Sequence, residues 1–316
     1  MSTITSTSAQ KRTPGVAWYF FLLALASLMW SCQGVAVKFL DRQMGPISIT
    51  FLPFYVTTLL FIPLLIRERR RNPLGSKVTW GDWKKFAMAG IGGQVLAQLG
   101  MTWGISDSLA SNGAILNLLI PVISAVLASF MLREKLTRLR VVALILGLAG
   151  VLLLSESDVR QSSFLQTQFL LGNLLIVGGC FGSSFYNVYC KGLLRKFSEV
   201  EILIFSYICA SIASLPLLFT VEPLHLKTFT ALDWKSWLAF GFLAIFMYGA
   251  SMLVFFKALQ HLDVTVASFS LYLVPIFGVL LAITILGERL SPIAIGGAAI
   301  VLVSTVLVMR YDSSSA

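Results

Sequence analysis

Charged residues are scarce in this chain. Only 12% of its 316 residues are Asp, Glu, Lys or Arg, whereas 57% are hydrophobic; soluble domains usually carry about a quarter charged residues. So few polar side chains cannot cover a water-facing surface, and so many apolar ones do not occur in a disordered chain. The composition therefore excludes a soluble enzyme, a disordered protein and a disulfide-rich secreted module.

Residue types that carry chemistry in many enzymes are also rare. The two histidines are isolated, and the four cysteines lack the C-x-x-C spacing of a redox or zinc site. The GxxxxGK[ST] motif of nucleotide-hydrolysing P-loops is absent as well. We therefore expect no catalytic residue, no metal and no cofactor, and the sequence predicts that the protein is not an enzyme.

Long apolar runs are what the chain has in abundance. A membrane-spanning helix takes about 20 mostly apolar residues, whereas a barrel strand would alternate over about 10. These runs are continuously apolar, which predicts an all-α membrane protein with ten transmembrane helices. The runs lie near 16–37, 46–66, 84–105, 109–131, 138–154, 168–190, 202–220, 236–258, 264–286 and 292–309.

The cations separate onto one side of this predicted bundle. Of the 24 Lys and Arg residues, 18 fall in breaks that share a side with both termini, and the remaining six lie on the other side. Cytoplasmic loops carry an excess of Lys and Arg. We therefore expect a multi-pass protein of a bacterial inner (plasma) membrane, with residues 1–15 as a disordered cytoplasmic tail and 310–316 as a second cytoplasmic tail.

This placement also explains the net charge of +10. The excess marks one face of a membrane, so the lipid bilayer and a small-molecule substrate are the expected partners, and nucleic acid is not. The sequence carries no sign of the oligomeric state.

The second half of the chain repeats the first. Residues 117–136 align without a gap on 271–290, and a Pro and a Glu thirteen residues later recur together. Such a joint recurrence is informative because matches of Leu and Ala are common in any apolar sequence. The matched pairs are Pro121 with Pro275 and Glu134 with Glu288.

Each copy of the repeat contains five predicted helices, the first over 16–155 and the second over 168–309. An odd number of spans makes the second copy enter the membrane from the opposite face. Inverted repeats place a substrate site near the bilayer midplane and allow the two sides to open alternately. The sequence therefore predicts a transporter.

Both copies close with an apolar run containing Pro and a Leu-x-Glu-basic-Leu turn, LREKL at 132–136 and LGERL at 286–290. Together with the Trp-Ser pair at 30–31 and MLVFFKALQHL at 252–262, these features resemble the EamA family of the drug/metabolite transporter superfamily. The resemblance covers about 16 to 309. It implies a central cavity lined mainly by the first, third, fourth, sixth, eighth and ninth helices, with the fifth and tenth packed outside.

Polar and amphipathic side chains within the runs are the predicted substrate contacts, because polar groups are costly in lipid and usually face the bundle interior. Hydrogen bonding between helices is the alternative role for the amides, and an interfacial belt is the alternative for the aromatics. The predicted substrate-binding residues are Trp30, Gln33, Gln94, Gln98, Asn117, Tyr186, Asn187, Tyr248 and Tyr272.

Residues near helix ends are predicted to line the two cavity mouths. Lys38 and Lys191 are equivalent in the repeat, so the inverted topology places them at opposite ends, where they would attract anionic or zwitterionic groups. Snorkelling of a single lysine to the interface is the alternative. The predicted gating or mouth residues are Lys38, Trp103, Lys191 and Lys257, whereas Glu134 and Glu288 are expected to fix helix ends.

All 14 carboxylates fall in breaks or at helix ends, so a buried acid relay for protons has no carrier midspan. We expect a secondary transporter, an exporter of a small organic metabolite such as an amino acid or related compound, acting by alternating access.

The alternative is an exchanger of sugar phosphates or nucleotide-sugars, although phosphate recognition favours several converging cations. An intramembrane enzyme would need a nucleophile–base pair, and a scaffold does not require an inverted repeat.

Overall fold

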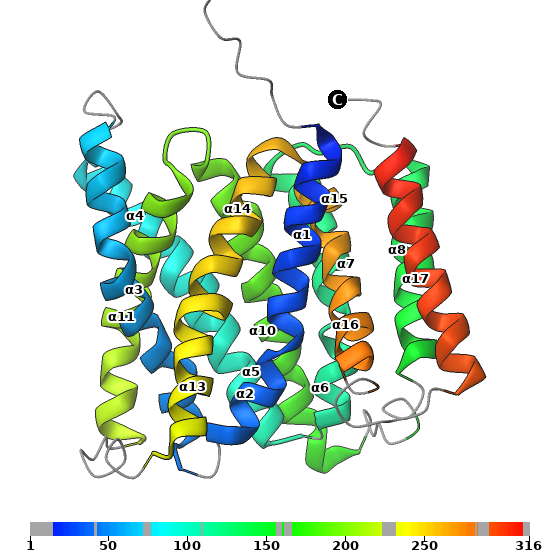
Figure 1. The fold of residues 1–316 in the computed structure, drawn as a ribbon, viewed down its shortest axis with the longest axis horizontal. Helices are drawn as coiled ribbons and strands as arrows, with labels where there is room; N and C mark the ends of the chain where they lie inside the picture. The colour runs from blue at the N-terminus through cyan, green and yellow to red at the C-terminus, as the bar shows by residue number, and fades with distance from the viewer. Residues whose placement is uncertain are drawn as a thin grey trace, which may run out of the picture.

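The computed structural model describes residues 15–40, 43–71, 77–108, 110–155, 160, 166–222, 232–281, 283 and 291–311. All regular secondary structure within these residues is helical (Figure 1), which confirms the predicted all-α class. The predicted tails lie largely outside the described residues, although the last helix continues into the second of them and ends at Tyr311.

Seven stretches of the described chain are long and apolar enough to cross a membrane. Three further helical stretches, at 80–106, 138–154 and 292–311, correspond to the remaining apolar runs but do not meet the same criterion of length and hydropathy. The count of ten therefore stays a prediction. The seven stretches are Val16–Val37, Pro46–Arg71, Asn112–Met131, Thr167–Leu193, Glu199–Thr220, Trp234–His261 and Val264–Leu281.

In the first half of the chain, several predicted spans consist of two or three consecutive helical segments. The third predicted span is a continuous rod whose middle is a π-helix, and the fourth is broken by a turn. The elements are α1 (Val16–Ser31), α2 (Gln33–Leu40), α3 (Pro46–Arg71), α4 (Trp80–Ala87), the π-helix η1 (Met88–Val95), α5 (Leu96–Ser106), α6 (Ala110–Leu116), α7 (Leu119–Met131) and α8 (Arg138–Leu154).

The second half shows the same kinds of interruption. Its third span again contains a π-helix, and its fourth contains a short 3₁₀ segment. The elements are α10 (Thr167–Leu193), α11 (Glu199–Thr220), α13 (Trp234–Phe242), the π-helix η2 (Leu243–Ala250), α14 (Ser251–His261), α15 (Val264–Ser268), the 3₁₀ helix η3 (Phe269–Tyr272), α16 (Leu273–Leu281) and α17 (Pro292–Tyr311).

Polar caps define where several of these helices begin. The Ser198 hydroxyl accepts the backbone N–H of Glu201, whose carboxylate in turn accepts the N–H of Ser198, so that α11 starts with a capping box. Asp233 accepts the N–H of Ser236 at the start of α13. These caps satisfy backbone donors that have no helical partner in the first turn.

Helices from the two halves intermix in the bundle. From the second half, α10 packs along α5, η1 and α7, and α11 packs on α4 and η1; these elements with α6 are termed the α10 group. From the first half, α1 packs along α14 and α16, α3 packs on η2, and α2 packs on α13; these elements with α15 and η3 are termed the α1 group. The main contacts between the groups run from α3 to α11 and from α7 to α15.

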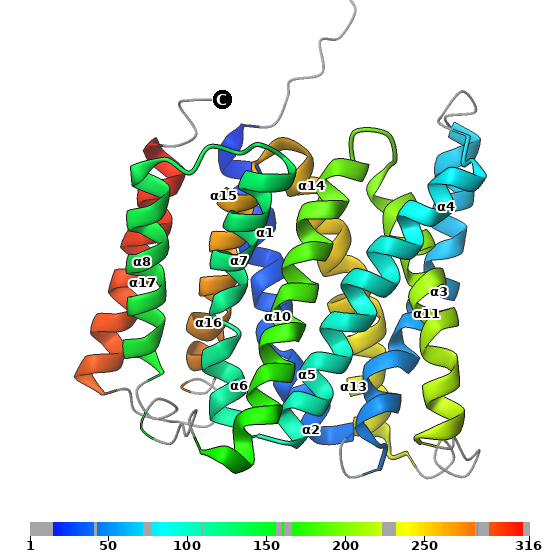
Figure 2. The same ribbon diagram turned by 180° about the vertical axis from the view of Figure 1, so that it is seen from behind.

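The remaining two helices, α8 and α17, pack on each other at one edge of the bundle, opposite the edge formed by α3 and α11 (Figures 1 and 2). This peripheral position agrees with what the family resemblance implied for the fifth and tenth helices. Figure 1 also shows that α1 begins and α17 ends at the same end of the bundle, termed end A. The opposite end is termed end B.

Candidate functional site

Four irregular segments lie at equivalent positions of the two halves. The π-helix η1, which begins at Met88, matches η2, which begins at Leu243. The turn at Asn117, between α6 and α7, matches Leu271 in η3, as the repeat alignment of 117–136 with 271–290 shows. π-Helical and broken segments frequently mark functional sites, and discontinuous membrane helices form the midplane binding sites of transporters. We therefore take these four segments as the candidate site.

The breaks have a local cause in the repeated prolines. Pro121 follows Asn117 by four residues and Pro275 follows Leu271 by four. Because proline lacks a backbone N–H, the carbonyl four residues earlier loses its helical partner. The Asn117 carbonyl accepts the N–H of Ile120 at 3.0 Å instead, which tightens the chain into a turn.

Side chains from the other half of the chain bond to the backbone at both breaks. The Ser27 hydroxyl in α1 donates to the Ser270 carbonyl in η3 at 2.7 Å, and the Cys180 thiol in α10 donates to the Leu116 carbonyl beside the turn at 3.3 Å. The two donors occupy equivalent positions of the repeat, and so do the two acceptors. The two halves therefore repeat one interhelical contact, a contact that the sequence analysis did not predict.

The predicted substrate residues Gln94, Asn117, Tyr248 and Tyr272 each belong to one of the four irregular segments. Residues chosen for their polarity therefore lie where the backbone departs from a regular α-helix. One of these segments also approaches a neighbouring helix closely. A Cβ at Gly90 in η1 would meet the backbone of α11, so only glycine fits that contact.

Gln94 and Tyr186 form one polar pair in the interior. Both side chains are buried, on η1 and on α10. The Tyr186 hydroxyl lies 3.0 Å from the Ser206 hydroxyl of α11. The backbone permits this approach because Gly93 packs directly against Tyr186, where a Cβ would lie 2.8 Å from the Tyr186 Cβ.

Tyr248 and Trp30 lie in the aromatic part of the α1 group. The Tyr248 ring packs on Phe54 with centroids 4.5 Å apart, and the Tyr248 carbonyl accepts the Tyr207 hydroxyl at 3.0 Å. Trp30 is half-buried, 5.4 Å from Phe255. Such rings offer apolar surface beside hydroxyl and amide groups.

The other predicted substrate residues are more scattered. Tyr272 is fully buried, but its ring packs against Gly147 of α8, and its hydroxyl has no hydrogen-bond partner within the described residues. The structure thus places Tyr272 towards the peripheral helices, away from the pair of Gln94 and Tyr186. Gln33, Gln98, Asn117 and Asn187 are half-buried, on α2, on α5, at the turn and on α10.

Two midspan amides that were not chosen as substrate contacts bond to each other. The Asn112 amide donates to the Asn173 side-chain carbonyl at 3.1 Å, and the Ser108 hydroxyl donates to the same oxygen at 2.6 Å. This triad ties the turn between α5 and α6 to α10. It is the helix-to-helix role considered for such amides.

Lys191 holds the turn between α14 and α15 at end A. Its Nζ donates to the carbonyls of Leu259 at 2.5 Å and Leu262 at 3.0 Å, which are unpaired acceptors at the end of a helix. From the other side, the Glu134 carboxylate accepts the N–H groups of Val264 at 2.7 Å and Thr265 at 3.0 Å. Glu134 therefore fixes a helix end, as predicted.

Among the other residues predicted near helix ends, the structure describes Lys257 and Trp103. Lys257 pairs with Glu199 at 3.0 Å, again at end A. Trp103 is half-buried on α5. The side chain of Lys38 and all of Glu288 lie outside the described residues.

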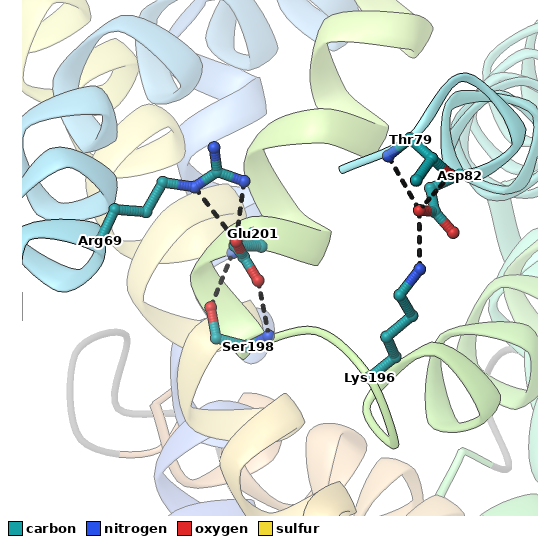
Figure 3. Close-up of polar contacts among 6 residues, drawn as sticks. All are labelled: Arg69, Thr79, Asp82, Lys196, Ser198 and Glu201. Atoms are coloured by element: carbon teal, nitrogen blue, oxygen red, sulfur yellow. Dashed lines mark hydrogen bonds and ion pairs between the residues drawn. The ribbon is translucent and has the colours of Figure 1, made fainter. Parts of the chain in front are cut away.

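Figure 3 shows two of the other ion pairs at end A. Arg69 at the end of α3 pairs with Glu201 of α11 at 2.9 Å, across the two groups. Lys196 pairs with Asp82 of α4 at 2.7 Å, within the α10 group. The bond from Lys196, together with those from Thr79, holds the pKa of Asp82 well below its usual range.

The repeated irregular helices and the membrane-crossing stretches define a membrane protein of the transporter class. A family model described as the EamA-like transporter family matches residues 17–156 and 170–310, and the chain belongs to that family. This confirms the resemblance found from the sequence, and the relatives are named as transporters.

Three relatives illustrate the range of named functions. An uncharacterized transporter of Archaeoglobus fulgidus is 26% identical over 92% of this chain and 98% of its own. A probable terminal-alkyne amino-acid exporter of Streptantibioticus cattleyicolor is 22% identical over 72% and 74%. An S-adenosylmethionine uptake transporter of Rickettsia bellii is 21% identical over 95% of both chains.

A crystal structure shares the fold. Its chain superimposes with a TM-score of 0.77 at 18% sequence identity, over 93% of this chain and 98% of the other. At this identity the likeness concerns the fold alone.

Proposed function

We propose that this protein is a secondary exporter of a small organic metabolite, an amino acid or a related compound, that works by alternating access. In this proposal ten transmembrane helices form two inverted five-helix repeats. The observation that carries the proposal is that η1 and η2, and likewise the Asn117 turn and η3, occupy equivalent positions of the two halves. Two equivalent interruptions in oppositely oriented halves provide one binding site that can face either side.

The chemistry of the candidate site favours a substrate with little net charge. None of the four irregular segments contains an Asp, Glu, Lys or Arg residue, and the polar groups around them are amides and hydroxyls. Such groups can bind both ends of a zwitterion through hydrogen bonds, while the neighbouring aromatic rings bind an apolar side chain. The relative named as an amino-acid exporter supports this substrate class.

An exchanger of sugar phosphates or nucleotide-sugars is the alternative. Phosphate groups are bound best by Arg or Lys in charge-assisted hydrogen bonds. Of the predicted mouth lysines, Lys191 is bonded to helix carbonyls and Lys257 is paired with Glu199, both at end A, so neither ammonium group is directed to a phosphate site. This engagement favours the amino-acid proposal.

The two groups of helices supply the moving parts of the proposed cycle. Lys191 lies on α10 and Glu134 in the loop that follows α7, and both bond to the α14–α15 turn of the α1 group. Arg69 with Glu201 and Lys257 with Glu199 also join the groups at end A. Opening end A would break these contacts, whereas Lys196–Asp82 would move as a unit.

Flux measurements in proteoliposomes test the proposed function. Purified protein should move labelled amino acids down a gradient without ATP, and Gln94→Ala should reduce this flux at least tenfold because it removes a buried amide of the site. The matched control is Gln168→Ala, at an exposed position of the same residue type at the start of α10, which should leave flux within twofold. Transport of sugar phosphates instead would favour the alternative, and no flux over a panel of amino acids, sugar phosphates and nucleosides would refute transport.

A further inference from the structure

The end of α3 carries arginines on two different faces. Arg69 points to the bundle, where it pairs with Glu201, and Glu68 beside it is half-buried. Arg67, Arg70 and Arg71 are exposed, and their spacing of three and four residues places them together on another face of the helix. Within the described residues no carboxylate is paired with these three.

A shallow cavity of about 370 Å³ lies along this exposed face. Its lining residues combine an apolar part, Pro63 and Ile66, with the three guanidinium groups. Farther along the same face, Leu59 and Leu60 are 67% and 52% exposed. The helix rises about 1.5 Å per residue, so the arginines stand about 10–18 Å from these leucines along the axis.

We propose that this face of α3 binds one anionic phospholipid of the bilayer. The headgroup phosphate would bond to Arg67, Arg70 and Arg71, and an acyl chain would lie over Pro63, Ile66 and the exposed leucines. Guanidinium groups bind phosphate through paired N–H donors, and basic clusters at the end of a membrane helix attract anionic lipids. Apolar surface continuous with the basic cluster is what distinguishes a lipid from a free phosphate ion.

The occupant is inferred from charge as well as from shape. Three guanidinium groups without a paired carboxylate exceed the single negative charge of a zwitterionic lipid's phosphate, which its own ammonium group neutralises. A phospholipid with a net negative charge, such as phosphatidylglycerol, complements them better. The proposal concerns the outer surface of the bundle and does not depend on the transported substrate.

Native mass spectrometry of the purified full-length protein tests this site. Dioleoylphosphatidylglycerol should be retained at least tenfold more tightly than dioleoylphosphatidylcholine, and the triple variant R67Q/R70Q/R71Q should lose this preference. The control variant R133Q/K135Q/R138Q removes the same charge from exposed residues near the start of α8, and its binding should stay within twofold. The single variant R70Q, with an expected loss of about threefold, serves if the triple variant does not fold.

Three outcomes would overturn the proposal. Equal losses in the two triple variants would mean that lipid binding follows net charge alone. Equal retention of the two lipids by the unmodified protein would remove the anionic preference. Displacement of the bound lipid by millimolar inorganic phosphate would assign the arginines to a free phosphate ion.

Discussion

Removing the Lys191 ammonium should favour opening of the bundle at end A. Lys191 connects α10 to the last carbonyls of α14, so it joins the two groups of helices that the proposed alternating access separates. Lys191→Met keeps the length and the apolar stem of the side chain but removes all three donors. The protein should then populate the conformation open at end A more often.

The expected size of the effect follows from the contacts. A hydrogen bond from a charged group contributes about 1.5–3 kcal/mol, and the half-buried Lys191 makes two close ones, at 2.5 and 3.0 Å. Water replaces part of this when end A opens, so we expect a net contribution of about 2 kcal/mol. Because about 1.4 kcal/mol corresponds to a tenfold change, the ratio of open to closed protein should rise about 30-fold.

Distances between spin labels measure this ratio. Labels on cysteines introduced at Trp18 of α1 and Trp80 of α4, both exposed positions at end A, report the separation of the two groups by double electron–electron resonance. The four native cysteines are first replaced. Lys191→Met should increase the population at the longer distance.

The control is the same substitution at Lys196. Its Nζ lies 2.7 Å from Asp82, but both residues belong to the α10 group. Lys196→Met should therefore change the ratio of open to closed protein by less than twofold. An unchanged distribution in Lys191→Met would refute the role of Lys191 in joining the groups. An equal shift in both variants would show that loss of positive charge, and not loss of a contact between groups, drives the opening.

Three further predictions concern packing, pH and topology. Gly93→Leu should abolish folded protein on size-exclusion chromatography, since even a Cβ would lie 2.8 Å from the Tyr186 Cβ, whereas Gly178→Leu, facing open space, should be tolerated. The pKa of Asp82 is lowered in the folded protein, so its contribution to stability is complete above its unfolded pKa near 4. The melting temperature of wild type should therefore exceed that of Asp82→Asn from pH 8 to 5, and a constant difference below pH 4 would contradict this. Reporter fusions at 158 and 225 should be outside the cell and fusions at 72 and 316 inside; any other pattern would refute ten spans.

Much of the fold could be read from the sequence because its signals are local. Continuous apolar runs determine which segments enter a membrane, since backbone groups in lipid must be satisfied within a helix. Pro121 and Pro275 each remove one backbone donor beside the break in the fourth helix of their half, but Pro53, Pro63 and Pro216 lie inside continuous helices, so proline alone does not locate a break. The repeat that relates the two halves could also be recognised from the sequence, because Pro and Glu recur at the same spacing within one short aligned segment.

The candidate site was only partly predictable. Gln94, Asn117 and Tyr248 were chosen for their polarity within apolar runs, and the structure places them in or beside irregular segments. The cross-helix bonds of Ser27 and Cys180 carry no local signal, because small residues of this kind occur throughout membrane helices. Only their equivalent positions in the repeat could have drawn attention to them.

The sequence by itself determined the class of the protein, the positions of its apolar segments and its internal repeat, whereas the breaks within the helices came from the structure. The tertiary structure alone decided that α5 and α7 of the first half pack on α10 of the second, and that Tyr272 faces α8. It also decided that Lys191 bonds to the end of α14. A lysine near a helix end has the same neighbours in sequence whether it reaches into water or binds another helix, so packing between distant segments settles its role.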